Sequence, residues 1–234
     1  MRLVALADLH GHLPQTPACD VLVLAGDLTP VRNHAPAFQA RWLDTTFRDW
    51  LEAQPAQAIV AIAGNHDFVF EQQPQLVPAL PWTYLQDSSC EIAGVTFWGS
   101  PWTPWFHDWA FNAPRADASE QFLTERYATA PEQTDVMILH GPPRGYGDRT
   151  AAGARVGSNA ALELVRRIEP ALAVYGHIHE DRGAWTLGAP QLANVAVVDA
   201  QYRPHHEPLM VFELSGSSGP TGQTTTAVTP AQAP

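Results

Sequence analysis

Apolar runs of strand length recur along this chain and are separated by segments with helical spacing. The runs are nearly continuous in Val, Ile, Leu and Ala, which is typical of strands buried on both faces. The six clearest are residues 3–7, 21–25, 59–63, 95–98, 136–139 and 172–175. Two later runs, 191–198 and 208–214, are expected to close the domain as strands.

Helical patterns occupy the intervals between these runs. Residues 38–51 repeat apolar side chains at spacings of three and four. Ser119 and Ser158 are candidate N-caps for helices over 119–128 and 159–168, and the second helix should stop before Pro170. Strands that alternate with helices predict an α/β domain over residues 1–214.

The C-terminal segment, residues 215–234, differs in composition from the rest of the chain. It consists mainly of Gly, Ser, Thr, Pro and Ala and has almost no large apolar side chain. Such a segment buries too little apolar surface to offset the entropy of ordering it. We therefore expect a disordered tail.

Composition narrows the class of protein. The chain has 234 residues, of which 45% are hydrophobic and 16% charged, as in an ordinary globular protein. No apolar run approaches the roughly 18 residues of a membrane span, and Asp8 interrupts the first run too early for a signal peptide. We expect a cytoplasmic protein without a membrane partner. Its two cysteines are expected to be free thiols.

The charge balance bears on partners and mechanism. A net charge of -11 argues against a long nucleic-acid partner, whose binding depends on neutralising phosphates. All 13 basic residues are Arg. The lack of Lys excludes mechanisms that need a Lys amine, such as those of P-loop and Schiff-base enzymes.

Five short blocks of metal-binding residue types follow the apolar runs. A single block of this kind is a weak signal, but five in order predict a metal site along one edge of a sheet. The blocks are Asp8-Leu9-His10, Gly26-Asp27, Gly64-Asn65-His66-Asp67, His140-Gly141-Pro142-Pro143 and Gly176-His177-Ile178-His179.

The spacing within the blocks suggests roles for their members. Asp8 and His10 are two residues apart, as are His177 and His179, so each pair can face one side of an extended strand end. Asp27 offers a carboxylate that can bridge two cations. Asn65 offers a neutral carbonyl oxygen. The adjacent His66 should face elsewhere and be free to act as an acid.

In their order and spacing, the blocks resemble the pattern of the calcineurin-like metallophosphoesterase superfamily over residues 3–214. A narrower resemblance, to the metallophosphoesterase-domain-containing (UPF0046-type) branch, rests on residues 99–112 together with the two His-containing blocks at 140–143 and 176–180. The resemblance implies an αββα sandwich, two mixed sheets flanked by helices. It also implies a phosphoesterase, and members of the branch act on phosphodiesters such as cyclic nucleotides.

The resemblance further implies two divalent transition-metal ions with a hydroxide held between them as the nucleophile. One ion would be held by Asp8, His10, Asp27 and His179, and the other by Asp27, Asn65, His140 and His177. Mixed nitrogen and oxygen ligands favour Mn, Fe, Zn or Co over Ca and Mg. His66 would protonate the leaving oxygen, and Asp67 would orient the His66 ring.

Substrate-binding residues are less well specified. Trp102 opens an aromatic segment, residues 102–111, which either stacks a nucleobase over the site or packs in the core. His12 is expected at the mouth of the site. Arg144 and Arg149 follow His140 and either approach a substrate phosphate or lie solvated on the surface.

The sequence thus predicts a dinuclear phosphoesterase for a small substrate, most simply a phosphodiester, with nucleotides among the candidates. A nucleotide phosphomonoesterase is the alternative enzyme, although only Arg could neutralise the extra charge of a monoester. A nucleotide-binding regulator with weak turnover is the alternative outside enzymes. A nuclease is disfavoured by the net charge.

Overall fold

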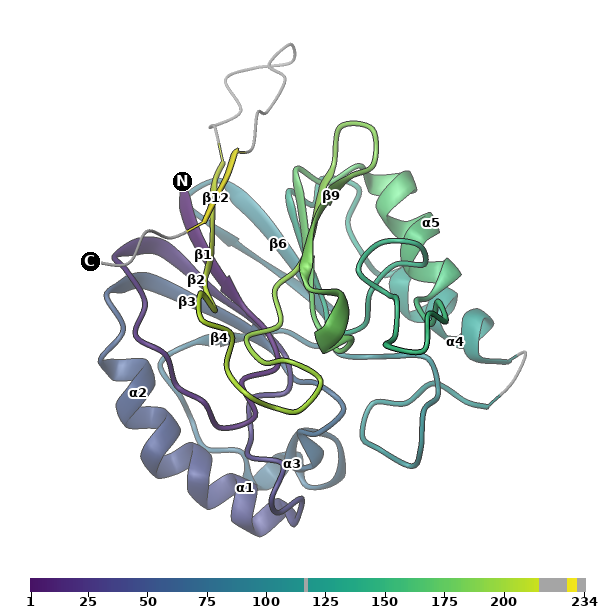
Figure 1. Cartoon of the computed structure of the whole chain (residues 1–234). Coiled ribbons are helices and arrows are strands. Elements are labelled where there is room, and N and C mark those ends of the chain that lie inside the picture. The colour runs from purple at the N-terminus through teal and green to yellow at the C-terminus, as the bar shows by residue number, and fades with distance from the viewer. Residues whose placement is uncertain (116–117, 215–226, 231–234) are drawn as a thin grey trace.

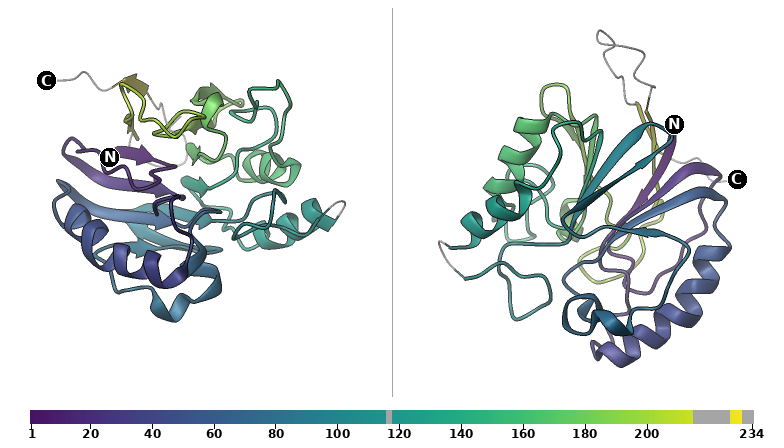
Figure 2. Two further views of the ribbon diagram at one scale, coloured as in Figure 1. Left: turned by 60° about the horizontal axis from the view of Figure 1, so that its bottom comes forward. Right: turned by 180° about the vertical axis from the view of Figure 1, so that it is seen from behind.

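The computed structural model describes residues 1–115, 118–214 and 227–230 and contains two six-stranded mixed sheets. Figure 1 shows the sheets side by side with helices on their outer faces, and the two views of Figure 2 agree. The first sheet has the order β12 (Ala227–Pro230), β11 (Met210–Glu213), β1 (Arg2–Leu6), β2 (Cys19–Ala25), β3 (Ala56–Ile62) and β4 (Thr83–Tyr84). The second has the order β5 (Ser88–Ile92), β6 (Val95–Ser100), β7 (Val136–Leu139), β8 (Leu172–Tyr175), β10 (Gln191–Asn194) and β9 (Gly183–Thr186). This is the expected αββα sandwich.

Both sheets are parallel at their centres, and all of their margins are antiparallel except at β4, which pairs with β3 in parallel. The strands β1, β2 and β3 pair in parallel, as do β6, β7, β8 and β10. The flanking pairs β1 with β11, β5 with β6, and β9 with β10 are antiparallel. Loops that follow the parallel strands consequently leave each sheet at the carboxyl ends of those strands.

The strand pleat sorts alternate side chains of each run into different core layers. In β1, Leu3 and Ala5 join the core between the two sheets, whereas Val4 and Leu6 pack under the helices of the first sheet. In β7, Val136 and Ile138 likewise join the central core, and Met137 packs under the helices of the second sheet. The continuous apolar runs therefore reflect burial on both faces.

The helices that cover the sheets follow the predicted positions closely. On the first sheet, α1 (Pro36–Trp42), a π-helical turn η1 (Leu43–Phe47) and α2 (Arg48–Glu52) run without interruption. On the second, α4 (Ala118–Tyr127) packs beside α5 (Asn159–Ile168). Shorter pieces are α3 (Phe68–Gln72), η2 (Pro74–Leu76) and η3 (His179–Asp181).

The two candidate N-caps have different outcomes. Ser158 caps α5, since its hydroxyl accepts a hydrogen bond of 3.1 Å from the backbone N–H of Ala161. Glu169 ends that helix in the left-handed conformation, directly before Pro170. Ser119 is not a cap: α4 already includes Ala118, and the Ser119 side chain is buried within the helix.

Several elements differ from the sequence-based expectation. The strands β4, β5 and β9 were not predicted, because their side chains are mostly exposed or half-buried and form no apolar run. The run 191–198 gives a shorter strand, β10. Most of the expected disordered tail lies outside the described residues, but residues 227–230 form β12 against β11. No helix among the described residues is long and apolar enough to cross a membrane.

Candidate metal centre

The predicted ligands lie in loops at the carboxyl ends of parallel strands from both sheets. Asp8 and His10 follow β1, Asp27 follows β2 and Asn65 follows β3. The second sheet contributes the loops after β7 and β8, which carry the other three histidines. The prediction of a site along one edge of a single sheet is therefore wrong in that respect, because two sheets share it. Carboxyl ends of parallel strands are a common location for binding sites in α/β proteins.

The backbone at several candidate ligands is locally strained. Asp8, His10, Asp27 and His177 have φ values of 56°, 44°, 54° and 69°. Residues other than Gly seldom adopt the left-handed backbone conformation, and backbone strain of this kind is common at functional sites. All four positions lie in loops that follow strands, and the backbone turns sharply at each of them. These turns direct the ligand side chains toward a common point.

Two glycines leave room for the carboxylates. A Cβ atom at Gly64 would collide with Oδ1 of Asp27, and one at Gly176 would collide with Oδ2 of Asp8. Glycine in these blocks is therefore required by close approach of the two carboxylates, in addition to any turn geometry.

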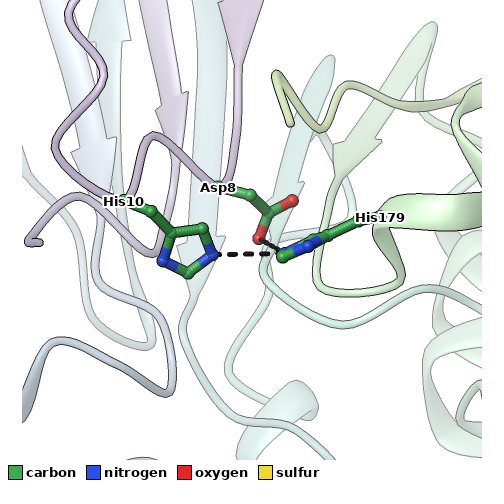
Figure 3. A group of neighbouring side chains, drawn as sticks. All are labelled: Asp8, His10 and His179. Atoms are coloured by element: carbon green, nitrogen blue, oxygen red, sulfur yellow. Dashed lines mark hydrogen bonds and ion pairs between the residues drawn. The ribbon is translucent and has the colours of Figure 1, made fainter. Parts of the chain in front are cut away.

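One group of candidate ligand atoms joins the first and last blocks of the sequence. A ligand atom from each of Asp8, His10 and His179 lies within 4.8 Å of the other two. The Nε2 atoms of His10 and His179 are 3.2 Å apart, and Nε2 of His179 is 3.5 Å from Oδ1 of Asp8. Figure 3 shows the three side chains pointing toward one another, Asp8 and His10 from the loop after β1 and His179 from the loop after β8.

A second group, formed by Asp8, Asp27 and His140, overlaps the first through Asp8, and Asp27 links the two. The Oδ2 atom of Asp27 is 3.6 Å from Nε2 of His10 and 3.4 Å from Nε2 of His140, so this one oxygen lies near both groups. Nε2 of His140 is also 2.8 Å from Oδ1 of Asn65. The ring of His177 lies edge-on to His140 with 5.2 Å between the ring centroids. The structure thus brings all seven predicted ligands together, with Asp27 central.

The hydrogen bonds around these groups orient their free atoms inward. Nδ1 of His140 contacts the backbone oxygen of Ala25 at 3.0 Å, which leaves Nε2 directed at Asp27. Both oxygens of Asp8 accept from the backbone N–H of His177 at 3.0 Å. Partners of this kind fix the orientation of metal-binding side chains.

The protonation of the cluster suits cation binding. Burial lowers the pKa of both His10 and His177 to about 3, so these rings are neutral, the form that binds metals. Burial would also lower the pKa of His140, but the nearby Asp27 carboxylate outweighs burial and raises that pKa to about 9. Burial opposes ionisation of Asp27 as well, yet the imidazole of His140 and its other neighbours hold its pKa well below the usual value.

A pair of divalent cations fits this donor set. The buried carboxylates attract positive charge so strongly that His140 takes up a proton, and a bound cation would compete with that proton. The donors are imidazole nitrogens with carboxylate and amide oxygens, the mixture that transition metals prefer. The residues therefore fit a pair of metal ions gathered around Asp8 and Asp27.

His66 lies beside the cluster without joining it. Its backbone N–H donates to Oδ1 of Asp27 at 2.7 Å, and its ring lies edge-on to His10 with a centroid separation of 5.1 Å. The ring is nearly buried, and burial lowers its pKa. Nδ1 of the ring is 3.0 Å from Nε2 of His34. His66 belongs to neither of the two candidate groups of metal-binding residues.

Asp67 does not orient the His66 ring, contrary to expectation. Its buried carboxylate accepts hydrogen bonds from the backbone N–H groups of Leu28, Thr29 and Gly64, and from the Thr29 hydroxyl, at 2.9 to 3.1 Å. Burial and the charge of Asp27 raise the pKa of Asp67 to about 6, against the effect of these donors. Asp67 instead ties the loop after β2 to the loop after β3.

A cavity of about 340 Å³ opens beside the candidate ligands. Its lining includes Asp27, Asn65, His66, His177 and His179. Four aromatic side chains form much of the remaining wall: Trp105, Phe106, Trp109 and Tyr202. The ring of Trp109 lies 4.4 Å from that of His66, between centroids. The lining contains Glu180 but no Arg.

None of the three residues predicted to bind substrate lines this cavity. Trp102 donates to Asp87 through Nε1 at 3.0 Å and packs on Phe111, so it serves the core. Arg144 is exposed and donates to a backbone oxygen in its own loop. His12 contacts the backbone oxygen of Tyr202, a residue of the cavity wall, at 3.2 Å. The aromatic segment is thus divided, since its middle part lines the cavity and its ends pack in the core.

Three further residues lie at the site, and the sequence alone assigned a role to none of them. Tyr202 packs on the rings of His10 and His179, with centroids 4.9 and 5.2 Å away, but it follows no motif. His34 contacts His66, and it belongs to none of the five blocks. Asn194, at the end of β10, donates to the backbone oxygen of Ile178, between two candidate ligands. Its position at a strand end was the one available signal.

Comparison with known proteins agrees with this geometry. A model of the calcineurin-like phosphoesterase family matches residues 1–181. Metallophosphoesterase domain-containing protein 1 of Homo sapiens is 33% identical over 239 residues, covering 90% of this chain and 70% of that protein. A UPF0046 protein of Caenorhabditis elegans is 28% identical over 253 residues, covering 92% and 60%.

Solved structures of low sequence identity share the fold. A dimetal phosphatase from Danio rerio matches with a TM-score of 0.55 at 12% identity and covers 90% of this chain and 91% of its own. The phosphopantetheinyl hydrolase from Mycobacterium tuberculosis matches with a TM-score of 0.53 at 15% identity and covers 88% and 94%. With the family match over most of its length and these relatives, the chain belongs to the calcineurin-like phosphoesterase family.

Proposed function

We propose that this phosphoesterase hydrolyses small phosphodiesters that carry a planar group, with cyclic nucleotides as the main candidates. The family uses two divalent metal ions, which activate water and neutralise charge on phosphate oxygens. The observation that carries the proposal is the cavity beside the ligand cluster, which has aromatic walls and no Arg in its lining.

The charge of the cavity favours a diester. A phosphodiester has one negative charge at neutral pH. A monoester has a second pKa of about 6, so its charge at neutral pH is close to two. The chain has no Lys, so only Arg could contact the additional charge. Because Arg is absent from the lining and Glu180 is present, the cavity favours the substrate with the smaller charge.

The aromatic walls favour a planar substituent. Trp105 and Phe106 are 38% and 51% exposed, although large aromatic side chains are usually buried when they serve only the fold. Stacking of a base on an aromatic ring contributes about 1–3 kcal/mol and tolerates any base. These walls also reduce the access of bulk water to the reacting groups.

Side chains of this protein supply the acid for the leaving group. His66 is the candidate acid for the leaving oxygen, because its ring lines the cavity and is held apart from the ligand groups. The backbone N–H of His66 donates to Asp27, so the acid and the central carboxylate have a fixed relation. A positioned acid is worth about 10²–10⁴-fold in rate.

A substrate panel tests the proposal. Metal-stripped and reloaded protein would be assayed with 2′,3′-cyclic and 3′,5′-cyclic nucleotides, bis-nitrophenyl phosphate and nitrophenyl phosphate. We expect metal-dependent turnover of the diesters and much weaker turnover of the monoester. Preferred hydrolysis of nitrophenyl phosphate would identify a phosphomonoesterase. Nucleotide binding without turnover of any ester would identify a regulator.

A pair of variants tests the role of the aromatic wall. Trp109→Ala should raise KM for cyclic nucleotides by about 5- to 150-fold, which corresponds to a stacking contribution of about 1–3 kcal/mol. KM for a methyl diester without a base should change little. Trp102→Phe, which keeps an aromatic ring outside the cavity, is the matched control and should leave both KM values unchanged. Equal effects of Trp109→Ala on the two substrates would contradict base stacking.

A further inference from the structure

His34 is the only side chain among the described residues that hydrogen-bonds the ring of His66. Its Nε2 atom lies 3.0 Å from Nδ1 of His66, and the ring centroids are 5.0 Å apart. His34 lies in the loop before α1, 32 residues from His66 along the chain. The contact therefore depends on the fold and does not follow from local sequence.

His34 is itself held in place. Its ring stacks on Phe68 with a centroid separation of 4.9 Å and an angle of 26° between the planes. The preceding residue, Asn33, accepts a hydrogen bond from the backbone N–H of Ala35 at 2.9 Å, which closes a tight turn around His34. The ring of His34 is half-buried, so it has both a supported face and access to solvent.

The backbone of His66 is fixed by other groups. Its N–H donates to Asp27, and its carbonyl oxygen accepts from Nε2 of Gln39 at 2.7 Å and from the Thr29 hydroxyl at 3.2 Å. Rotation of the imidazole ring is the freedom that these bonds leave. The ring has two nitrogens, and which of them faces the cavity depends on a partner for the other.

We infer that His34 is a positioning residue that accepts the Nδ1–H of His66 and thereby presents Nε2 of His66 to the leaving oxygen. The inference rests on the proposed function, in which His66 is the acid. Among the described residues, no group hydrogen-bonds Nε2 of His66, so that atom is available to a substrate in the cavity.

The proton count is consistent with this role. In the reacting state His66 is the imidazolium, because Nε2 has taken up a second proton from solvent in the cavity. When the bond between phosphorus and the leaving oxygen breaks, that Nε2 proton passes to the oxygen and the neutral ring with its proton on Nδ1 is restored. The proton on Nδ1 remains in the hydrogen bond to His34 throughout. His34 therefore gains and loses no proton in the step, and its contribution is the orientation and tautomer of the His66 ring.

Three substitutions at one position separate hydrogen bonding from packing. His34→Phe keeps an aromatic ring on Phe68 but removes the acceptor. His34→Gln places an amide close to the position of the original Nε2, whereas the shorter His34→Asn reaches only the position of Nδ1. We expect His34→Phe and His34→Asn to lower kcat for an alkoxide-leaving diester by about 10- to 100-fold, the usual effect of losing a partner of this type. His34→Gln should restore most of the rate.

A double-variant cycle tests whether the effect passes through His66. In a His66→Gln background, His34→Phe should cause no further loss, and both changes should matter less for a nitrophenolate leaving group. Bound metal should stay at the wild-type level. An equal loss in both backgrounds, or loss of metal in the His34 variants, would show a structural role and overturn the inference.

A spectroscopic readout separates this inference from the proposed function. In the zinc-loaded protein, two-dimensional ¹⁵N–¹H NMR of the histidine rings should show the His66 proton on Nδ1, and His34→Phe should shift it toward Nε2. This result would support the inference even if no diester were hydrolysed. A wild-type His66 protonated only on Nε2, or a spectrum unchanged by His34→Phe, would overturn it even in an active diesterase.

Discussion

Replacing Asp67 with Ala is expected to destabilise the fold, although the residue carries neither a metal nor a substrate in our account. Its carboxylate is fully buried and receives four donors from two loops. Those loops hold Asp27 and Asn65. The change therefore probes whether a buried acceptor assembles the metal centre.

The magnitude follows from counting donors. Asp67→Ala leaves the N–H groups of Leu28, Thr29 and Gly64 buried without an acceptor, at about 1–3 kcal/mol each. The Thr29 hydroxyl can still donate to the oxygen of His66. Removing a carboxylate whose burial is itself unfavourable offsets part of the loss, so we expect a net cost of about 3–5 kcal/mol, as for other broken buried charge contacts.

Asp67→Asn is the matched variant, because it removes the charge of the side chain but keeps one acceptor oxygen. Its amide oxygen can take the place of Oδ1, which accepts from Leu28 and Thr29. Its NH₂ group then faces the N–H groups of Gly64 and Leu28, of which Gly64 has no other acceptor in the side chain. One lost acceptor predicts a cost of about 1–3 kcal/mol. Urea denaturation of chelator-treated protein would measure both variants, since bound metal would otherwise add to the stability of the folded state. An Ala variant within about 1 kcal/mol of wild type, or an Asn variant that is less stable than the Ala variant, would refute the reasoning.

Three further changes have expected outcomes. Gly176→Ala should displace the Asp8 carboxylate and lower metal content, as measured by elemental analysis, because the added Cβ has no space beside Oδ2; full metal occupancy would contradict this. Ser158→Ala should lower the unfolding free energy by about 1 kcal/mol through loss of the α5 cap and leave activity unchanged, and a change in kcat would argue against a purely local role. Asp27→Asn should lose metal, because a neutral amide is a poor bridge between two dications, and an unchanged metal content would remove Asp27 from the centre of the site.

The elements that could be predicted from the sequence are those that a short stretch of residues determines without distant contacts. The apolar runs predict β1, β2, β3, β7 and β8, because strands buried on both faces need little context. The cap at Ser158 was predictable for the same reason. The ligand blocks were readable because each follows such a strand, and the family resemblance then gave the sandwich.

The remainder depends on contacts between distant segments. From the sequence, Asp67 is expected to orient the adjacent His66 ring. In the fold its carboxylate oxygens accept hydrogen bonds from the backbone N–H groups of Leu28 and Thr29, which lie in another loop. Trp102 and Trp109 belong to one aromatic segment, and only the fold decides that the first packs inward and the second lines the cavity. His34 approaches His66 across 32 residues of chain, a distance that no motif spans.

This cluster is expected to hold two metal ions that share Asp27. The most direct measurement is elemental analysis of the purified chain, before and after chelation, together with phosphodiesterase activity on the same samples. We predict two transition-metal ions per chain, loss of metal and activity on chelation, and recovery of both on reloading with Mn, Fe, Zn or Co. A chain with no bound metal whose diesterase activity is unaffected by chelator would contradict the account.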